Sequence, residues 1–198
     1  MNTLSKDTRP NLQPSSNSGL SVLNFQLNWF AVRVTYGREL ALKAILDEEK
    51  IENFIPMRHE YITRNGRRMR KLVPAVHNLV FIHSTRKKID ELKEKFSVKV
   101  PIRYIMNRAT NQPVLIPEEQ MRSFILVSGN YDEAILYIEP AELALAKGQK
   151  VRIIDGIFKG AIGELVRIRH DRRVVVNIEG LMAVATTFVH PSLVELIV

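Results

Sequence analysis

The chain has 198 residues, of which 45% are hydrophobic and 25% charged, and this composition fits one or two small globular domains. Its 29 Lys and Arg against 21 Asp and Glu give a formal net charge of +8, which favours a polyanion such as nucleic acid as a neighbour. The absence of cysteine excludes disulfides, thiolate metal ligands and a cysteine nucleophile, and no apolar run approaches the ~20 residues that cross a bilayer.

The amino-terminal end has a composition unlike that of the remainder. Residues 1–27 are rich in Asn and Ser, contain two prolines and show no sustained period, which predicts a disordered tail. A charged start followed by an apolar core, the pattern of a signal peptide, is absent, so we expect a cytoplasmic protein. Residues 28–34 then predict a central strand, because apolar side chains occupy both faces. In residues 38–50, which follow, the apolar residues recur at helical spacing and predict a helix.

A hairpin and a second buried strand come next. An extended run begins at Phe54, and Asn65-Gly66 is the strongest short hairpin signal in the chain. The returning arm spans residues 71–83 and contains the apolar run 79–82, which predicts a buried strand. The paired arms are long enough to project beyond a compact sheet.

The first half of the chain closes with two helices separated by a strand. A short helix is predicted from about Arg86, a strand over 100–106, and a third helix from Pro117. The order of strand, helix, hairpin, helix, strand and helix predicts an α+β domain over 28–128, with an antiparallel sheet flanked by helices.

The second half of the chain reads as a separate β unit. Residues 129–146 lack a confident strand pattern and are interpreted as a linker, although apolar residues within them are able to dock on either neighbour. Short β-rich runs then predict a small SH3-like β-barrel over 147–198. These runs are 150–154, 162–169, 173–178 and 182–188.

A glycine-containing turn marks the start of this β unit. The segment from Lys150 to Val166 has β-branched runs around Asp155-Gly156 and two further glycines, and it closely resembles the KOW motif. In the first half, Trp29-Phe30-Ala31-Val32, Phe54-Ile55-Pro56 and the basic hairpin leading to Leu79-Val80-Phe81-Ile82 look like the amino-terminal (NGN) domain of the NusG family. The resemblance covers about residues 28–198.

The segment before the buried strand distinguishes branches of this family. NusG proteins usually carry Phe-Pro-Gly-Tyr there, whereas this chain has Val76-His77-Asn78-Leu79, which resembles the specialised paralogues of UpxY type related to RfaH. The resemblance implies a transcription antitermination factor that binds the clamp helices of RNA polymerase and promotes processive elongation of selected operons, such as those for capsular polysaccharide. The alternative is a KOW-containing RNA-binding or ribosome-associated protein without activity on polymerase.

The resemblance also implies binding surfaces. The polymerase-facing patch is expected to combine Val76 and Leu79 with Met121 and Phe124. All four also fit an ordinary core, because the two helical residues have the spacing that faces a sheet.

Basic side chains gather at two places in the first half. One group surrounds the hairpin turn and the other opens the second helix, where a cation is unfavourable for the helix dipole. We expect both to contact nucleic acid, at upstream or non-template DNA. Charge that protects a hairpin from edge pairing is the alternative for the first group. The residues are Arg64, Arg67, Arg68, Arg70 and Lys71, and Arg86, Lys87 and Lys88.

The KOW loop supplies a third candidate surface. Ile157, Phe158 and Lys159 are expected to bind a protein partner, and the resemblance suggests a small-subunit ribosomal protein or Rho. Packing across the barrel mouth is the alternative for the two apolar residues. The five histidines form no metal-ligand motif, and no phosphate-binding loop or nucleophile motif is present. We therefore expect a monomeric protein that is not an enzyme and needs no cofactor or metal.

Overall fold

The structure, a computed structural model, describes residues 26–139, 148–168, 170–178 and 180–197. Within these ranges the protein has the predicted α+β class, and its strands pair in antiparallel fashion. Nearly all of the expected tail over 1–27 lies outside the described residues, as does the second part of the expected linker.

The N-terminal sheet is organised around strand β1. The order of its strands is β2-β5-β1-β6, and β9 also pairs with β1, so β1 is central as predicted. The strands are β1 (Asn28–Val34), β2 (Asn53–Phe54), β5 (Leu79–Ser84), β6 (Ile102–Tyr104) and β9 (Leu115–Ile116). A separate pair, β7 (Met106–Asn107) and β8 (Gln112–Pro113), follows β6.

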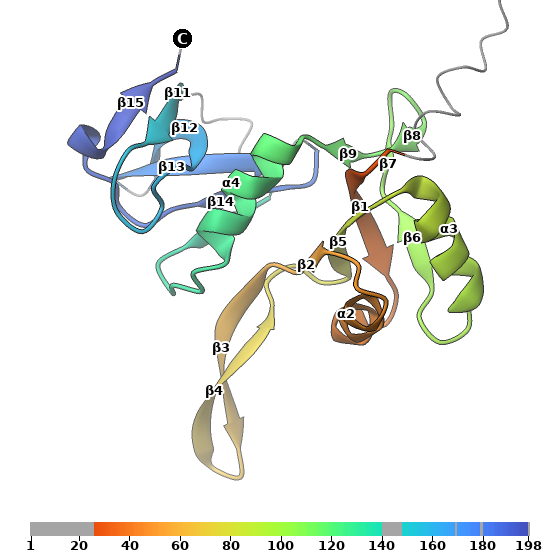
Figure 1. Cartoon of the computed structure of the whole chain (residues 1–198). Helices are drawn as coiled ribbons and strands as arrows, with labels where there is room; N and C mark the ends of the chain where they lie inside the picture. Colours follow the sequence, from red (N-terminus) through yellow and green to blue (C-terminus); the bar gives the residue numbers. More distant parts are fainter. Residues whose placement is uncertain (1–25, 140–147, 169, 179, 198) are drawn as a thin grey trace, which may run out of the picture.

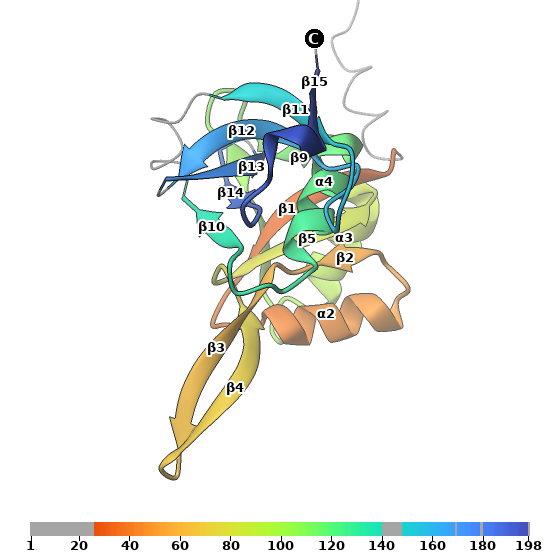
Figure 2. The ribbon, with the colours of Figure 1, turned by 90° about the vertical axis from the view of Figure 1, so that its left-hand side faces the viewer.

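The two faces of this sheet belong to two different cores. Alternate residues of a strand point to opposite faces. Phe30 and Val32 therefore join one cluster with helices α2 (Glu39–Glu48) and α3 (Arg86–Lys95). Trp29 and Ala31 join a second cluster with helix α4 (Glu118–Ser128). In Figure 2, α4 lies in front of β1 and β5, and α3 lies behind them.

A long hairpin leaves the N-terminal sheet. Strands β3 (Met57–Arg64) and β4 (Arg67–Pro74) pair only with each other within the described residues, and they project from the body of the protein (Figure 1). Asn65 and Gly66 have φ angles of 53° and 73°, the left-handed values that a two-residue hairpin turn requires. The predicted hairpin and its turn are confirmed, but the predicted returning arm is divided, because β4 ends at Pro74 and the apolar run 79–82 lies in β5 of the N-terminal sheet.

The C-terminal sheet has six strands in the order β10-β14-β13-β12-β11-β15. The four strands β11 to β14 follow the four predicted runs closely, whereas β10 and β15 were not predicted. β10 lies within the segment interpreted as a linker. The strands are β10 (Leu136–Ile138), β11 (Gln149–Ile153), β12 (Ile162–Ile168), β13 (Asp171–Ile178), β14 (Met182–Ala185) and β15 (Val194–Leu196), with a 3-10 turn, η1 (Pro191–Leu193), before β15.

Gly163 is a position where the C-terminal sheet has no room for a side chain. A Cβ atom there would lie 2.4 Å from the backbone oxygen of Val175. We expect Gly163→Ala to push β12 from β13 and to lower the free energy of unfolding by about 1–3 kcal/mol. Urea denaturation measures this change. Lys150→Ala, an exposed substitution on the adjacent strand, is the control and is expected to cost less than about 0.5 kcal/mol.

Candidate functional site

Helix α4 lies between the two sheets. It packs against β1 on one side and against β12, β13 and β14 on the other (Figure 1). The backbone N–H of Ile162 donates a hydrogen bond to Oγ of Ser123 at 3.1 Å, and the side-chain amide of Gln120 donates to the backbone oxygen of Asn177. The C-terminal sheet is therefore held on α4 by directional bonds as well as by apolar packing.

The four residues predicted to face polymerase gather in one apolar cluster. Leu79, Met121 and Phe124 are buried, and Val76 packs against them partly buried. The same cluster contains residues of the C-terminal sheet, among them Val174. In this arrangement the four residues therefore serve as core, and their contact with polymerase stays a prediction.

The ring of Phe124 packs onto the N-terminal sheet. Its centroid lies 5.6 Å from that of Phe81 and 6.2 Å from that of Phe54, both in edge-on geometry. Such pairs contribute beyond the apolar area that they bury. Phe124 therefore fixes α4 to its own sheet, while Gln120 and Ser123 face the C-terminal sheet.

A polar cluster at Trp29 holds the first turn of α4. The indole N–H of Trp29 donates to Oε2 of Glu118 at 2.9 Å, and the indole ring stacks on His83 at 4.9 Å. Arg122 donates to the other oxygen of Glu118 at 2.8 Å. This bond is the main reason that the pKa of Glu118 lies below its usual value, and the Trp29 bond adds to it. Trp29, itself buried, thus supports the first turn of α4.

Residues 131–138, called the strap below, connect the C-terminal sheet with the hairpin. The guanidinium of Arg173 donates to the backbone oxygen of Ala134 at 2.7 Å, and β10 pairs with β14. The hydroxyl of Tyr137 donates to the backbone oxygen of Met57, at the base of the hairpin, at 3.0 Å. Burial raises the pKa of that hydroxyl. The linker interpretation missed the strand in this strap, although residues 135–138 form a run of four apolar side chains in the sequence.

The hairpin register divides the basic residues between two faces. Tyr61 lies opposite Arg70, and Thr63 opposite Arg68, so Tyr61, Arg68 and Arg70 share one face, called the tyrosine face. Arg64, Arg67 and Lys71 share the opposite face. All five basic residues are exposed, as binding to nucleic acid requires. The binding itself stays a prediction.

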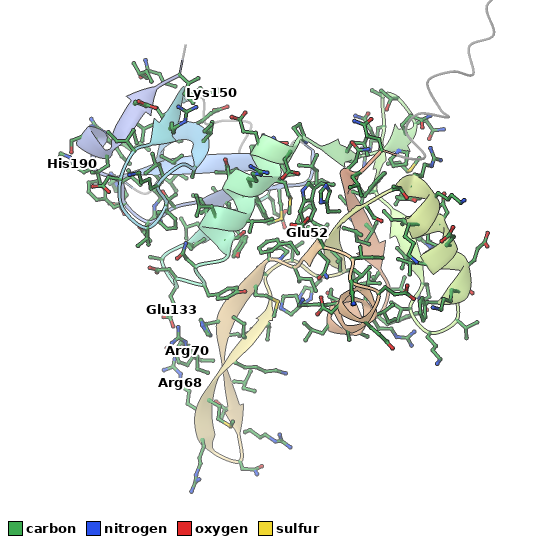
Figure 3. The ribbon with its side chains drawn as sticks, viewed as in Figure 1. Glu52, Arg68, Arg70, Glu133, Lys150 and His190 are labelled. Carbon is green, nitrogen blue, oxygen red and sulfur yellow. The ribbon has the colours of Figure 1, made fainter. Side chains whose placement is uncertain are left out.

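The tyrosine face has an internal anion. Arg70 lies 3.2 Å from Oε1 of Glu133 in the strap, and the Tyr61 hydroxyl donates to the same oxygen at 3.2 Å. The guanidinium of Arg68 lies over the Tyr61 ring, 4.1 Å from its centroid. Figure 3 shows Glu133 reaching toward Arg70, with Arg68 further along the hairpin.

The second predicted basic group has acidic neighbours. Lys88 lies 3.1 Å from Glu49, the residue that follows α2, and Arg86 lies 3.9 Å from Asp90. Lys87 is exposed and forms no ion pair within the described part of the chain. These pairs account for two cations at a helix start without an external anion, and contact with nucleic acid stays a prediction.

The KOW loop places its three predicted residues differently. Ile157 is 63% exposed and Lys159 is also exposed, so both are accessible to a partner. Phe158 is only 4% exposed and belongs to the apolar cluster around α4. Its side chain is therefore packed inside the protein, as in the alternative to partner binding.

Across the described ranges, no group of three or more His, Asp or Glu side chains gathers as potential metal ligands. None of the described helices is both long and apolar enough to span a membrane. What the structure does gather is an apolar cluster around α4 and a set of arginines on the hairpin.

Comparison with known proteins identifies the family. The family model described as "Transcription termination factor nusG" matches residues 27–125, half of the chain. The chain belongs to the NusG family. A solved structure titled "Domain interaction in Thermotoga maritima NusG" is 22% identical, with a TM-score of 0.44, and the alignment covers 87% of this chain and 98% of that one. No curated protein sequence matches.

The NusG match covers the parts of the structure that carry the candidate site. Residues 27–125 include the N-terminal sheet, the whole hairpin and most of α4. The C-terminal sheet and the strap lie outside the match. The protein is thus a transcription factor of the NusG family, while its KOW motif and its UpxY subtype rest on the sequence resemblance alone.

The role of Phe124 in holding α4 is open to direct test. Phe124→Ala removes a ring that contacts two other aromatic rings, and we expect it to lower the free energy of unfolding by about 3–5 kcal/mol. Phe188→Ala is the matched control, because Phe188 is 55% exposed and is expected to cost less than about 0.5 kcal/mol. Equal costs in urea denaturation of the two variants would contradict the packing described.

Proposed function

We propose that this protein is a transcription antitermination factor of UpxY type. It binds the clamp helices of RNA polymerase through its N-terminal half and promotes processive elongation of selected operons, such as those for capsular polysaccharide. One observation carries the proposal: Val76, Leu79, Met121 and Phe124 lie in one continuous apolar cluster around α4, with the C-terminal sheet on its far side. Continuous apolar surface of this kind suits a partner helix.

The proposed docking surface is covered in the present arrangement. The C-terminal sheet packs on α4 and accepts or donates hydrogen bonds through Asn177 and Ile162. Polymerase therefore has to bind a form in which the C-terminal sheet has left α4. Since polymerase has affinity only for that open form, its binding shifts the population from closed to open.

The proposal assigns roles to the other two surfaces. The hairpin contacts upstream or non-template DNA, supported by its five exposed basic residues. The KOW loop binds a protein, either a small-subunit ribosomal protein or Rho, through the exposed Ile157 and Lys159. That contact is accessible even while α4 is covered.

A disulfide across the α4 interface tests the need for opening. Ser123 and Ile162 are adjacent across the interface, with Oγ and N 3.1 Å apart, and the natural chain has no cysteine. We expect Ser123→Cys with Ile162→Cys, once oxidised, to retain about a tenth or less of its binding to core RNA polymerase in a pull-down. Reduction with dithiothreitol should restore it.

The single variant Ser123→Cys controls for the substitution, and the natural protein controls for the oxidant. Undiminished binding by the fully cross-linked protein would show that polymerase uses a surface other than the covered one.

The activity itself is measured by transcription in vitro. On templates that carry a capsule-operon leader, we expect the protein to shorten the lifetime of pauses and to increase the fraction of full-length transcript. The oxidised double-cysteine variant should lack this effect, because it cannot expose the docking surface. No change in pausing together with tight binding to leader RNA would instead favour the RNA-binding alternative.

A further inference from the structure

A groove separates the base of the hairpin from the strap. It measures about 310 Å³ and is bordered by Met57, His59 and Tyr61 on the hairpin side. On the strap side, Tyr131 and Tyr137 border it. Three tyrosines thus line one small groove, in a chain that has only five. Nothing in the polymerase-docking proposal uses these rings.

The tyrosines are suited to stacking. Tyr61 is 49% exposed and Tyr131 is 37% exposed, so part of each ring is accessible from solvent, with the Arg68 guanidinium over the ring of Tyr61. Aromatic side chains beside a basic track are the usual platform for the bases of single-stranded nucleic acid. Here the basic track is Arg68 and Arg70, which lie on the same face of the hairpin as Tyr61. A duplex, whose bases are already stacked on one another, gains nothing from such rings.

The groove also has an unsatisfied polar atom. Nδ1 of His59 is buried and finds no hydrogen-bond partner among the described residues. A buried polar group without a partner costs free energy.

The carboxylate of Glu133 already places an anion on Arg70. Glu133 lies 3.2 Å from the Arg70 guanidinium and accepts a hydrogen bond from the Tyr61 hydroxyl at 3.2 Å (Figure 3). Both a carboxylate and a phosphodiester are anions that accept hydrogen bonds from arginine. The pair is exposed, with about half of each side chain accessible, so it exchanges readily with an external anion.

We propose that this groove and the tyrosine face of the hairpin form a binding site for single-stranded nucleic acid, in which a backbone phosphate replaces Glu133 on Arg70. Bases stack on Tyr61 and Tyr131. The carboxylate of Glu133 acts as a competing internal ligand. The inference rests on the proposed nucleic-acid contact of the hairpin but not on polymerase binding, so its test contains no polymerase.

Fluorescence anisotropy with the full chain and a fluorescein-labelled 12-nucleotide oligo(dT) tests the competition. Glu133→Gln removes the internal anion, and we expect it to tighten binding by about three- to fivefold. Glu139→Gln is the matched control, because it makes the same change of charge at an exposed residue near the strap. If the two variants tighten binding equally, Glu133 does not compete and the proposal fails.

Two arginines on opposite faces of the hairpin test the site's location. Arg70→Gln should weaken binding about fivefold and reduce the slope of log affinity against log salt by about 0.7, the loss of one phosphate contact. Arg67→Gln, on the opposite face, should weaken binding less and leave the slope unchanged. Equal losses in affinity and slope would mean a diffuse attraction to the hairpin and would overturn the site.

The stacking step has its own readout. Tyr61→Ala should weaken binding of the oligonucleotide about tenfold, while leaving the melting temperature within the range of the other surface variants. A 12-base-pair duplex should bind more weakly than the single strand and be insensitive to Tyr61→Ala. Duplex binding as tight as that of the single strand, with no effect of Tyr61→Ala on either, would exclude stacking in the groove.

Discussion

The packing of α4 between two sheets is the constraint on which the rest of the structure depends. On one side Phe124 meets Phe81 and Phe54 of the N-terminal sheet, and on the other Ser123 and Gln120 bond the C-terminal sheet. A single helix thus contributes to the interior of both halves. Any motion of one sheet relative to the other has to break contacts of this helix, either the aromatic packing against the N-terminal sheet or the hydrogen bonds and apolar packing against the C-terminal sheet.

Local signals in the sequence were sufficient for most of the N-terminal half. The apolar side chains on both faces of residues 28–34 predicted that β1 lies at the centre of its sheet, and Asn65-Gly66 specified the hairpin turn through its tolerance of positive φ. The family resemblance was supported by the NusG match over residues 27–125. These features depend on neighbouring residues or on a motif, so they can be predicted from the sequence alone.

Features that depend on residues distant in the chain could not be predicted from the sequence. β10 has three residues and exists because it pairs with β14, more than 40 positions later in the chain, so no periodic pattern announces it. Glu49, just after α2, pairs with Lys88 of α3, and Glu133 of the strap pairs with Arg70 of the hairpin. Ile157 and Phe158 are adjacent apolar residues, and the sequence did not indicate that the first is exposed and the second buried. Nor did it indicate which face of α4 packs against which sheet. Tertiary contacts decide each of these.

The packing of the C-terminal sheet on α4 has a consequence for the protein when no partner is bound. Large exposed apolar patches promote self-association. The proposed docking surface of Val76, Leu79, Met121 and Phe124 would carry this risk whenever no partner is present, yet here the C-terminal sheet shares a core with it. In the proposed function, the sheet therefore also protects this surface from self-association until polymerase binds.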